Sequence, residues 1–123
     1  MQLNLERPDY QYFLRGADGA SALVNERRIE RSFVIAPDAL VEGWPLQDVH
    51  AMQPADLDVL FAQHPELIVL GTGASQVFPP AIVMAACLQR GIGIEVMSNA
   101  AAARTYSVLA GEGRRVVAGF VFA

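Results

Sequence analysis

The sequence predicts an α/β fold in which residues 1–123 form a single three-layer domain around a mixed sheet. Three observations lead to this prediction. Short alternating runs between turn residues fill the first third of the chain, which is typical of antiparallel strands. From residue 66 onward the order is strand, helix, strand, helix, strand, which predicts parallel strands joined by a right-handed crossover. A length of 123 residues with 53% hydrophobic residues suffices for one core without disulfides or metals.

The first third of the chain is expected to form two or three antiparallel strands. Gly16, Gly19 and Asn25 separate its apolar runs at the spacing of turns. Residues 28–35 alternate and are expected to form one half-buried strand that ends at Pro37. These strands either extend the parallel sheet or form a second layer on it.

The middle of the chain combines an irregular link with a helix. Trp44 lies in the link over residues 41–54 and is expected to fill a gap in the core. Pro54 suits the first turn of a helix, which is predicted over residues 55–63. The residues expected on its buried face are Leu57, Leu60 and Phe61.

A parallel pair of strands is predicted on either side of a second helix. The apolar run over residues 66–71 is typical of a strand buried on both faces, and residues 92–97 form the next strand beside it. The helix between them, over residues 79–90, has no polar side chain before Gln89 and therefore lacks the hydrophilic face of an ordinary surface helix. Either the N-terminal segment or another copy of the protein is expected to cover it.

The chain is expected to end with a third helix and a last strand. The helix is predicted over residues 98–113, with Ser98 or Asn99 as its N-cap, and the strand over residues 114–123. The residues expected on the buried face of the helix are Thr105, Val108 and Leu109, with Tyr106 to one side.

Charge and composition limit the classes of partner and the location. A net charge of −4 argues against binding to DNA or RNA, because the broad attraction to phosphates is missing. No apolar stretch is long enough to span a membrane, and no export signal is recognised, so a cytoplasmic location is expected. The single cysteine, Cys87, lies in an apolar run and is predicted to be a buried, inert thiol.

The stretch "VLGTGASQVFPP" offers the strongest candidate for a site. Glycines that end a buried strand and lead to a helix suit anion binding by backbone N–H groups. A dinucleotide site is disfavoured, because Gln76 stands where a third glycine is required and Pro79 and Pro80 lack N–H donors. A structural turn is therefore favoured, and a smaller anion or polar ligand is the alternative. The candidate residues for that ligand, which an arginine of the third helix would help to hold, are Gly71, Thr72, Gly73, Ser75, Gln76 and Arg104.

Neither a catalytic group nor a metal site nor a cofactor is predicted. His50 and His64 have no ligand partners at helical spacing, and Ser75 lacks the glycine pattern of a nucleophile elbow. Asp56 and Asp58 are two positions apart on a helix and point to different sides, so they do not form an acid and base pair.

The stretch "LIVLGTGASQVFPP" followed by "GIGIEVMSNAAAARTYSVLAGEGRRVVAGFV" resembles the MTH-type domain family, domain of unknown function 498/598. The resemblance covers nearly the whole chain, with "LVNERRIERSFVIAP" and Trp44 matching its N-terminal half. It implies one compact α/β domain without established catalytic residues. Eukaryotic members are described as assembly or regulatory proteins, one of them for a mitochondrial respiratory complex. Ser98 and Asn99 depart from the Asp-Thr pair expected in this family.

Together these observations favour a non-enzymatic protein that binds a partner protein, an accessory factor for assembling a respiratory complex by resemblance. The surface expected to bind is the apolar one around the second helix. The alternative is a small-molecule or anion-binding protein that uses the turn over residues 71–76. A homo-oligomer is compatible with both.

Overall fold

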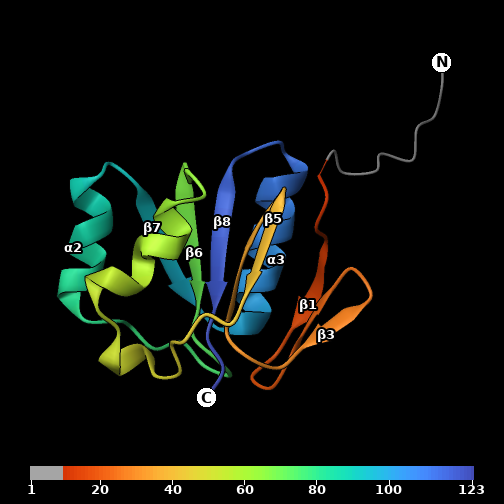
Figure 1. Ribbon diagram of the computed structural model, residues 1–123, viewed down its shortest axis with the longest axis horizontal. Coiled ribbons are helices and arrows are strands. Elements are labelled where there is room, and N and C mark those ends of the chain that lie inside the picture. Colours follow the sequence, from red (N-terminus) through yellow and green to blue (C-terminus); the bar gives the residue numbers. More distant parts are fainter. Residues whose placement is uncertain (1–9) are drawn as a thin grey trace.

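A computed structural model describes residues 10–123 and has a central mixed sheet of five strands in the order β5-β4-β8-β6-β7 (Figure 1). The middle strand of its parallel part is β6 (Leu67–Gly71), which pairs in parallel with β7 (Gly93–Met97) and with β8 (Val116–Phe120). The predicted parallel pair is confirmed. Because β6 is covered by a strand on each side and a layer on each face, all five of its residues are buried.

Some of the N-terminal strands extend the central sheet and the others form a second layer, so both alternatives that the sequence left open occur. β4 (Phe33–Ala36) and β5 (Ala39–Glu42) extend the central sheet, with β4 antiparallel to both β5 and β8. β1 (Leu14–Ala17), β2 (Ala22–Val24) and β3 (Arg27–Ile29) form a separate antiparallel sheet.

The predicted single strand over residues 28–35 is wrong, because the chain leaves one sheet and enters the other between Ile29 and Phe33. Buried Ser32 fixes this crossing: its hydroxyl donates to the Leu46 carbonyl at 2.5 Å and accepts from the Phe122 N–H at 2.9 Å. Ile29 and Phe33 nevertheless belong to the same hydrophobic cluster. The alternation therefore identified a common core rather than a continuous strand.

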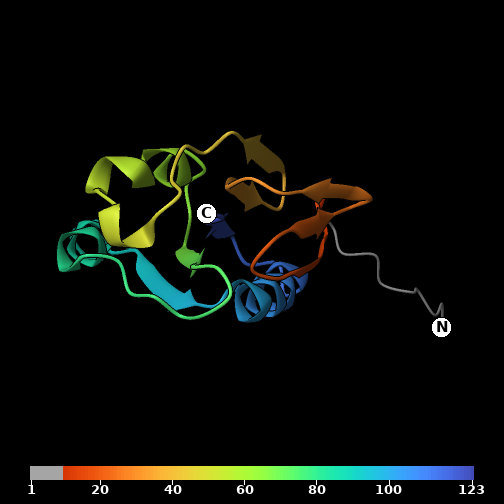
Figure 2. The same ribbon diagram turned by 90° about the horizontal axis from the view of Figure 1, so that it is seen from below.

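Helices cover the two faces of the central sheet (Figures 1 and 2). On one face lie α2 (Ala81–Gln89) and the short helical segments η1 (Val49–Ala51), η2 (Pro54–Leu57) and α1 (Asp58–Phe61). On the other face lie α3 (Asn99–Gly111) and the sheet of β1, β2 and β3. The predicted three-layer α/β arrangement is confirmed.

The helix predicted over residues 55–63 is shorter and less regular than expected. A 3-10 segment leads into a single α-helical turn that ends at Phe61, and His64 then adopts a left-handed conformation with φ 57° before Pro65. The Asp56 carbonyl in this segment accepts the indole N–H of Trp44 at 3.0 Å. Trp44 is buried in the core as predicted.

Two hydrophobic clusters share the central sheet, because successive residues of each strand point to opposite faces. In β6, Leu67 and Val69 pack with α3, whereas Ile68 and Leu70 pack with α2. Cys87 of α2 is fully buried, as predicted, and burial raises the pKa of its thiol above the ordinary value.

The prediction for the buried face of α3 is wrong. Tyr106 is fully buried, Thr105 is only partly buried, and Val108 is 59% exposed. Alanines at positions 102, 103 and 110 share the buried face with Tyr106, and their small side chains let the helix approach the sheet. The large apolar residues Val108 and Leu109 misled the prediction, because the packed face of this helix is built mainly from alanine.

Candidate functional site

The glycine turn lies at the edge of the sheet where ligands bind in many α/β proteins. The parallel strands β6, β7 and β8 all end at this edge, with Gly71 opposite Met97 on one side and Phe120 on the other. From here β6 leads to α2 on one face, and its neighbour β7 leads to α3 on the other face. In open α/β sheets, ligands commonly bind at the carboxyl ends of the strands.

The side chain of Asn99 lies against this turn and is fully buried. Its Oδ1 accepts the Gly73 N–H at 3.0 Å, and its Nδ2 donates to the carbonyls of Asp18 at 3.0 Å and Val121 at 3.3 Å. A Cβ at Gly71 would overlap Asn99 Oδ1. Gly71 therefore makes room for Asn99, while Gly73, with φ 102°, adopts a backbone conformation that glycine tolerates best.

The side chains of Thr72 and Gln76 in the turn are also engaged within the protein. The Thr72 hydroxyl donates to the Ser75 carbonyl at 2.7 Å and accepts the Val77 N–H at 2.9 Å. Gln76 Nε2 donates to the Val96 carbonyl at 2.8 Å. These contacts tie the end of β6 to the end of β7. These contacts are those of a structural turn, the interpretation that the sequence favoured.

The six predicted ligand residues fall into two places. Gly71, Thr72, Gly73, Ser75 and Gln76 lie together in the turn, and Thr72 and Gly73 line a hollow of about 310 Å³ that also includes His50. Arg104 instead lines a hollow between β1 and α3. Arg104 therefore does not share a cavity with the turn. The binding of an anion to the turn stays a prediction.

A patch of large apolar side chains is exposed on and just before α2. Phe78 is 62% exposed, Ile82 63% and Leu88 69%, and these three residues define the α2 patch. The helix has no charged residue over its length. Its inward residues Val83 and Cys87 are apolar, and so are the outward residues Ile82 and Leu88. The sequence predicted this unusual helix correctly. The separate sheet of β1, β2 and β3 lies at the far end of the molecule from α2, so this part of the N-terminal region does not cover the patch (Figure 1).

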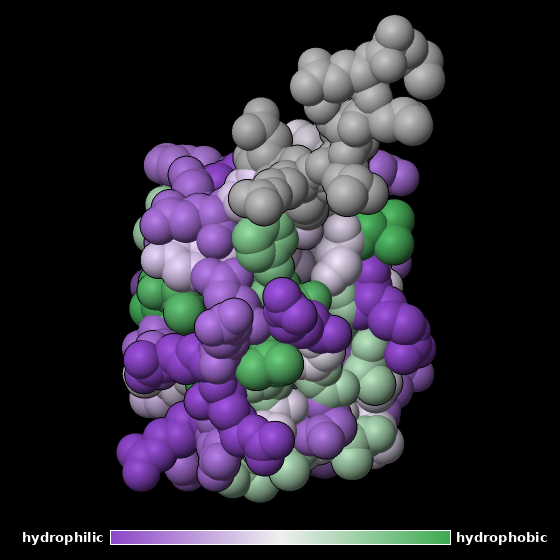
Figure 3. Space-filling model, turned by 90° about the vertical axis from the view of Figure 1, so that its right-hand side faces the viewer, coloured by the Kyte–Doolittle hydropathy of each residue, from purple (hydrophilic) through white to green (hydrophobic). Residues whose placement is uncertain are grey.

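The end of the molecule opposite α2 differs in character. It shows mainly hydrophilic side chains with separate hydrophobic ones between them (Figure 3). Of the large hydrophobic side chains exposed within residues 10–123, Leu23 and Val108 lie outside the α2 patch. Three of the five such residues are therefore concentrated at one short helix.

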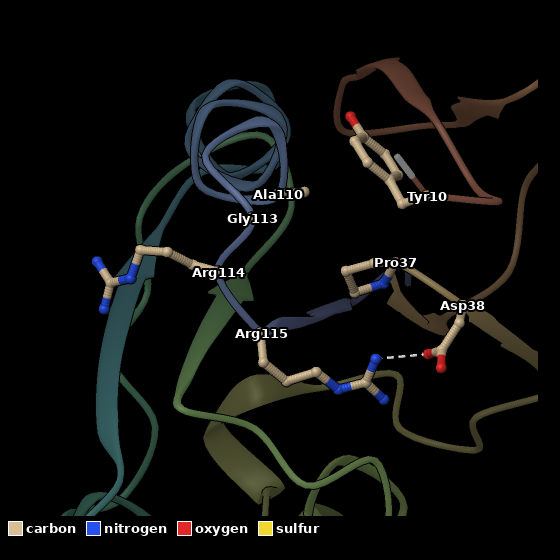
Figure 4. Close-up of a pocket in the computed structure, with 7 residues that line it drawn as sticks. All are labelled: Tyr10, Pro37, Asp38, Ala110, Gly113, Arg114 and Arg115. Carbon is tan, nitrogen blue, oxygen red and sulfur yellow. Dashed lines mark hydrogen bonds and ion pairs between the residues drawn. The ribbon is translucent and has the colours of Figure 1, made fainter. Parts of the chain in front are cut away.

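A third hollow, of about 280 Å³, lies between the C-terminal end of α3 and the turn from β4 to β5 (Figure 4). We call it the α3-end cavity. It is lined by Tyr10, Pro37, Asp38, Ala110, Gly113 and Arg115, together with Arg114, whose side chain points away from it.

Arg115 is held in the α3-end cavity by three hydrogen bonds. Its Nη1 donates to Asp38 Oδ1 at 2.5 Å, and its Nε and Nη2 both donate to the Gln63 carbonyl, at 2.9 and 2.8 Å. The hydrogen bond from Arg115 holds the pKa of the Asp38 carboxyl below its ordinary value. The result is a fixed, charge-balanced pair with donor and acceptor groups side by side.

The hydroxyl of Tyr106 is buried beside this cavity and has no hydrogen-bond partner within residues 10–123. Burial raises the pKa of Tyr106 far above its ordinary value, and Tyr10 and Asp38 raise it further, while Arg115 lowers it. Buried polar groups are rarely left unpaired. Sequence reasoning missed the burial of this group. The spacing of four residues between Tyr106 and Ala110, which places both on one helix face, is the signal that could have found it.

Two kinds of site are absent from the described residues. Residues 10–123 contain no group of three or more His, Cys, Asp or Glu side chains placed to hold a metal ion. His50 and His64 are exposed, and His50 Nδ1 lies 3.4 Å from Asp48 Oδ1. Over the same part of the chain, every helix is too short or too polar to cross a membrane.

Comparison with known proteins identifies a family that this chain matches. Residues 15–121 match the family described as "Protein of unknown function (DUF498/DUF598)". A curated relative, the "13 kDa major membrane protein" of Francisella tularensis subsp. holarctica (strain LVS), is 31% identical over 71 residues. That match spans 58% of this chain and 58% of the relative.

Solved structures share the fold. An NMR structure from Xanthomonas campestris has 55% sequence identity and a TM-score of 0.84, covering 98% of this chain and 92% of the other. A Bordetella pertussis protein described as a Mth938-like domain has 26% identity and a TM-score of 0.76, with coverage of 98% and 92%. Neither description states an activity.

Proposed function

The chain belongs to the DUF498/DUF598 family, and from this premise we propose that it is a non-enzymatic protein that binds a partner protein through the α2 patch. The exposure of Phe78, Ile82 and Leu88 on a helix without charged residues carries the proposal. Soluble monomers rarely leave large apolar side chains together on the surface unless that surface binds something.

The size of the α2 patch indicates the kind of partner. Its three side chains together expose on the order of 300 Å². A stable dimer of two rigid domains needs about 800 Å² from each partner, so the patch is too small for that on its own. It matches the apolar face of an amphipathic helix, which anchors a few large side chains along one stripe. We therefore assign an amphipathic helix of another protein as the occupant.

The family resemblance and one relative suggest where this partner acts. Eukaryotic proteins that the chain resembles are described as assembly or regulatory factors, and the Francisella relative is named a membrane protein. These support an accessory role in the assembly of a respiratory complex, in which this cytoplasmic protein binds a subunit before or during its insertion into the membrane.

Site-specific photo-crosslinking in cells tests this proposal. A photoreactive phenylalanine is placed at position 82 in the α2 patch, and in a matched protein at position 108 on α3. Ile82 and Val108 have similar exposure, so the two probes differ in location rather than in access to solvent. Products are identified by mass spectrometry, and the crosslinked segment of the partner is sequenced.

The expected result is a product at position 82, absent at position 108, that contains an amphipathic helical segment of another protein. Formation of a product with a second copy of this chain would reassign the occupant and contradict the proposal. Identical products from both positions would show that the partner does not bind specifically at the α2 patch, which also contradicts the proposal.

Binding of a small anion or polar molecule at the glycine turn is a second candidate. Its support is the hollow of about 310 Å³ beside Thr72 and Gly73, at the carboxyl ends of the parallel strands. Titration with inorganic phosphate tests it: saturable shifts in the amide resonances of residues 72–76 support a site, and their absence at millimolar phosphate contradicts one.

A further inference from the structure

The α3-end cavity combines three features that the partner-binding role does not use. It is a concave space of about 280 Å³, which approaches the size of small-molecule sites. It contains the fixed pair of Arg115 and Asp38. The hydroxyl of Tyr106, which has no hydrogen-bond partner among the described residues 10–123, is buried beside it.

The charges of the cavity indicate a neutral ligand. The guanidinium of Arg115 and the carboxylate of Asp38 neutralise each other, and the side chain of Arg114 points away toward Glu66, at 3.8 Å. Arg115 uses its hydrogens on Asp38 and on the Gln63 carbonyl, which leaves one N–H on each terminal nitrogen. Asp38 is largely exposed and has free acceptor positions. The pair therefore offers a donor next to an acceptor.

The walls of the cavity indicate a flat ligand. Tyr10 and Pro37 lie across the space from Ala110 and Gly113 at the end of α3, as Figure 4 shows, and the rings of Tyr10 and Pro37 both present apolar surfaces. Tyr10 is only partly buried, whereas Tyr106 is fully buried. The charged or ionisable groups that influence the Tyr106 hydroxyl are Tyr10, Arg115 and Asp38, and all three line the cavity.

We propose that the α3-end cavity binds a neutral planar heterocycle with an amide-type edge, in which an N–H donor and a carbonyl acceptor are adjacent. The carbonyl of the ligand accepts from Arg115, and its N–H donates to Asp38. The ring packs against Tyr10 and Pro37. With the ligand bound, the Tyr106 hydroxyl gains a hydrogen-bond partner, which it lacks within residues 10–123.

Two small probes test the recognition of this edge. The heterocycle 2-pyridone carries the adjacent N–H and carbonyl, and N-methyl-2-pyridone has the same ring and carbonyl without the donor. Each is titrated into 15N-labelled protein up to several millimolar, because a probe of this size is expected to bind with a Kd on the order of 1 mM. The amide resonances of residues 110–115 and 37–38 report on the cavity.

Three variants locate the interaction. Asp38→Asn removes the acceptor while keeping a side chain of the same shape that still accepts from Arg115. Tyr106→Phe removes the buried hydroxyl. Tyr12→Phe is the matched control, because Tyr12 does not line the cavity. The folded state of each variant is checked by its NMR spectrum before titration.

The proposal predicts saturable shifts at the cavity with 2-pyridone, with at least tenfold weaker binding of N-methyl-2-pyridone. It predicts a Kd raised threefold or more in Asp38→Asn and in Tyr106→Phe, and an unchanged Kd in Tyr12→Phe. Absence of cavity shifts with 2-pyridone, or equal binding of the two probes, would overturn it. Unchanged binding by both Asp38→Asn and Tyr106→Phe would overturn it as well.

Discussion

Replacing Tyr106 by phenylalanine is expected to stabilise the unliganded protein. The hydroxyl is buried and has no partner within residues 10–123, and leaving such a group unpaired costs about 1–3 kcal/mol. Removing one oxygen leaves a void of roughly 15 Å³, which costs only about 0.4 kcal/mol. The net gain in the free energy of unfolding is therefore about 1 kcal/mol. For a chain of 123 residues this corresponds to a rise in Tm of about 4 °C.

Urea denaturation and calorimetry at neutral pH measure this effect, with Tyr12→Phe as the matched control. Tyr12 is only partly buried, so its hydroxyl reaches water more easily and its removal is expected to change stability by less than about 0.5 kcal/mol. A loss of more than about 0.5 kcal/mol in Tyr106→Phe would refute the reasoning, because it would show that the hydroxyl makes a stabilising hydrogen bond in the folded protein.

Alkaline pH gives an independent measure of the same group. Burial raises the pKa of Tyr106 in the folded state, whereas an unfolded tyrosine ionises near its ordinary value of about 10. Below pH 10 the hydroxyl is protonated in both states, and its ionisation does not affect stability. Above pH 10 the unfolded state ionises first, so the free energy of unfolding falls as the pH rises. The wild type should lose about 1.4 kcal/mol more than Tyr106→Phe for each pH unit above 10. Parallel losses in the two proteins would contradict the burial of an unpaired hydroxyl.

Three further predictions concern the glycine turn, the exposed pair and the α2 patch. Gly71→Ala should destabilise the fold by about 2 kcal/mol or more, because the new Cβ overlaps Asn99. In a double-mutant cycle with Asn99→Ala, followed by urea denaturation, the second change should recover part of this loss, and strictly additive losses would contradict the contact. Asp38→Asn should reduce the loss of stability in acid, because the hydrogen bond that lowers the pKa of this carboxyl stabilises the folded state above the ordinary Asp pKa and is lost as the pH falls below it. Thermal melts over a series of pH values measure this, and an unchanged dependence of Tm on acid pH would count against the pair. Ile82→Glu should change stability by less than about 0.5 kcal/mol, as should Val108→Glu, because both side chains are mainly exposed; a large loss measured by calorimetry in either one would show that it packs in the fold.

Local patterns were sufficient for the parts of the fold that depend on neighbours in sequence. The apolar run that became β6 and the apolar helix α2 between two strands predicted the parallel pair and the exposed patch. Burial of Cys87 followed from the same run. In each case the signal and the structure involve the same few consecutive residues.

Other features depend on contacts between distant parts of the chain. Asn99 bonds to the carbonyl of Asp18, 81 positions away, so no local pattern could show that its side chain occupies the space that Gly71 leaves open. Ser32 and Phe122 are 90 positions apart, and their hydrogen bond fixes the crossing that interrupts the run over residues 28–35. The phase of α3 was ambiguous because alanines occur on several of its faces.

Binding of the crosslinked partner segment to purified protein tests the role of the α2 patch most directly. The segment is synthesised as a peptide and titrated into 15N-labelled wild type, Ile82→Glu and Val108→Glu. Shifts are predicted in the amide resonances of residues 78–89, with a Kd at least tenfold weaker in Ile82→Glu and unchanged in Val108→Glu. Equal affinity of all three proteins, or shifts confined to other elements, would contradict partner binding at α2.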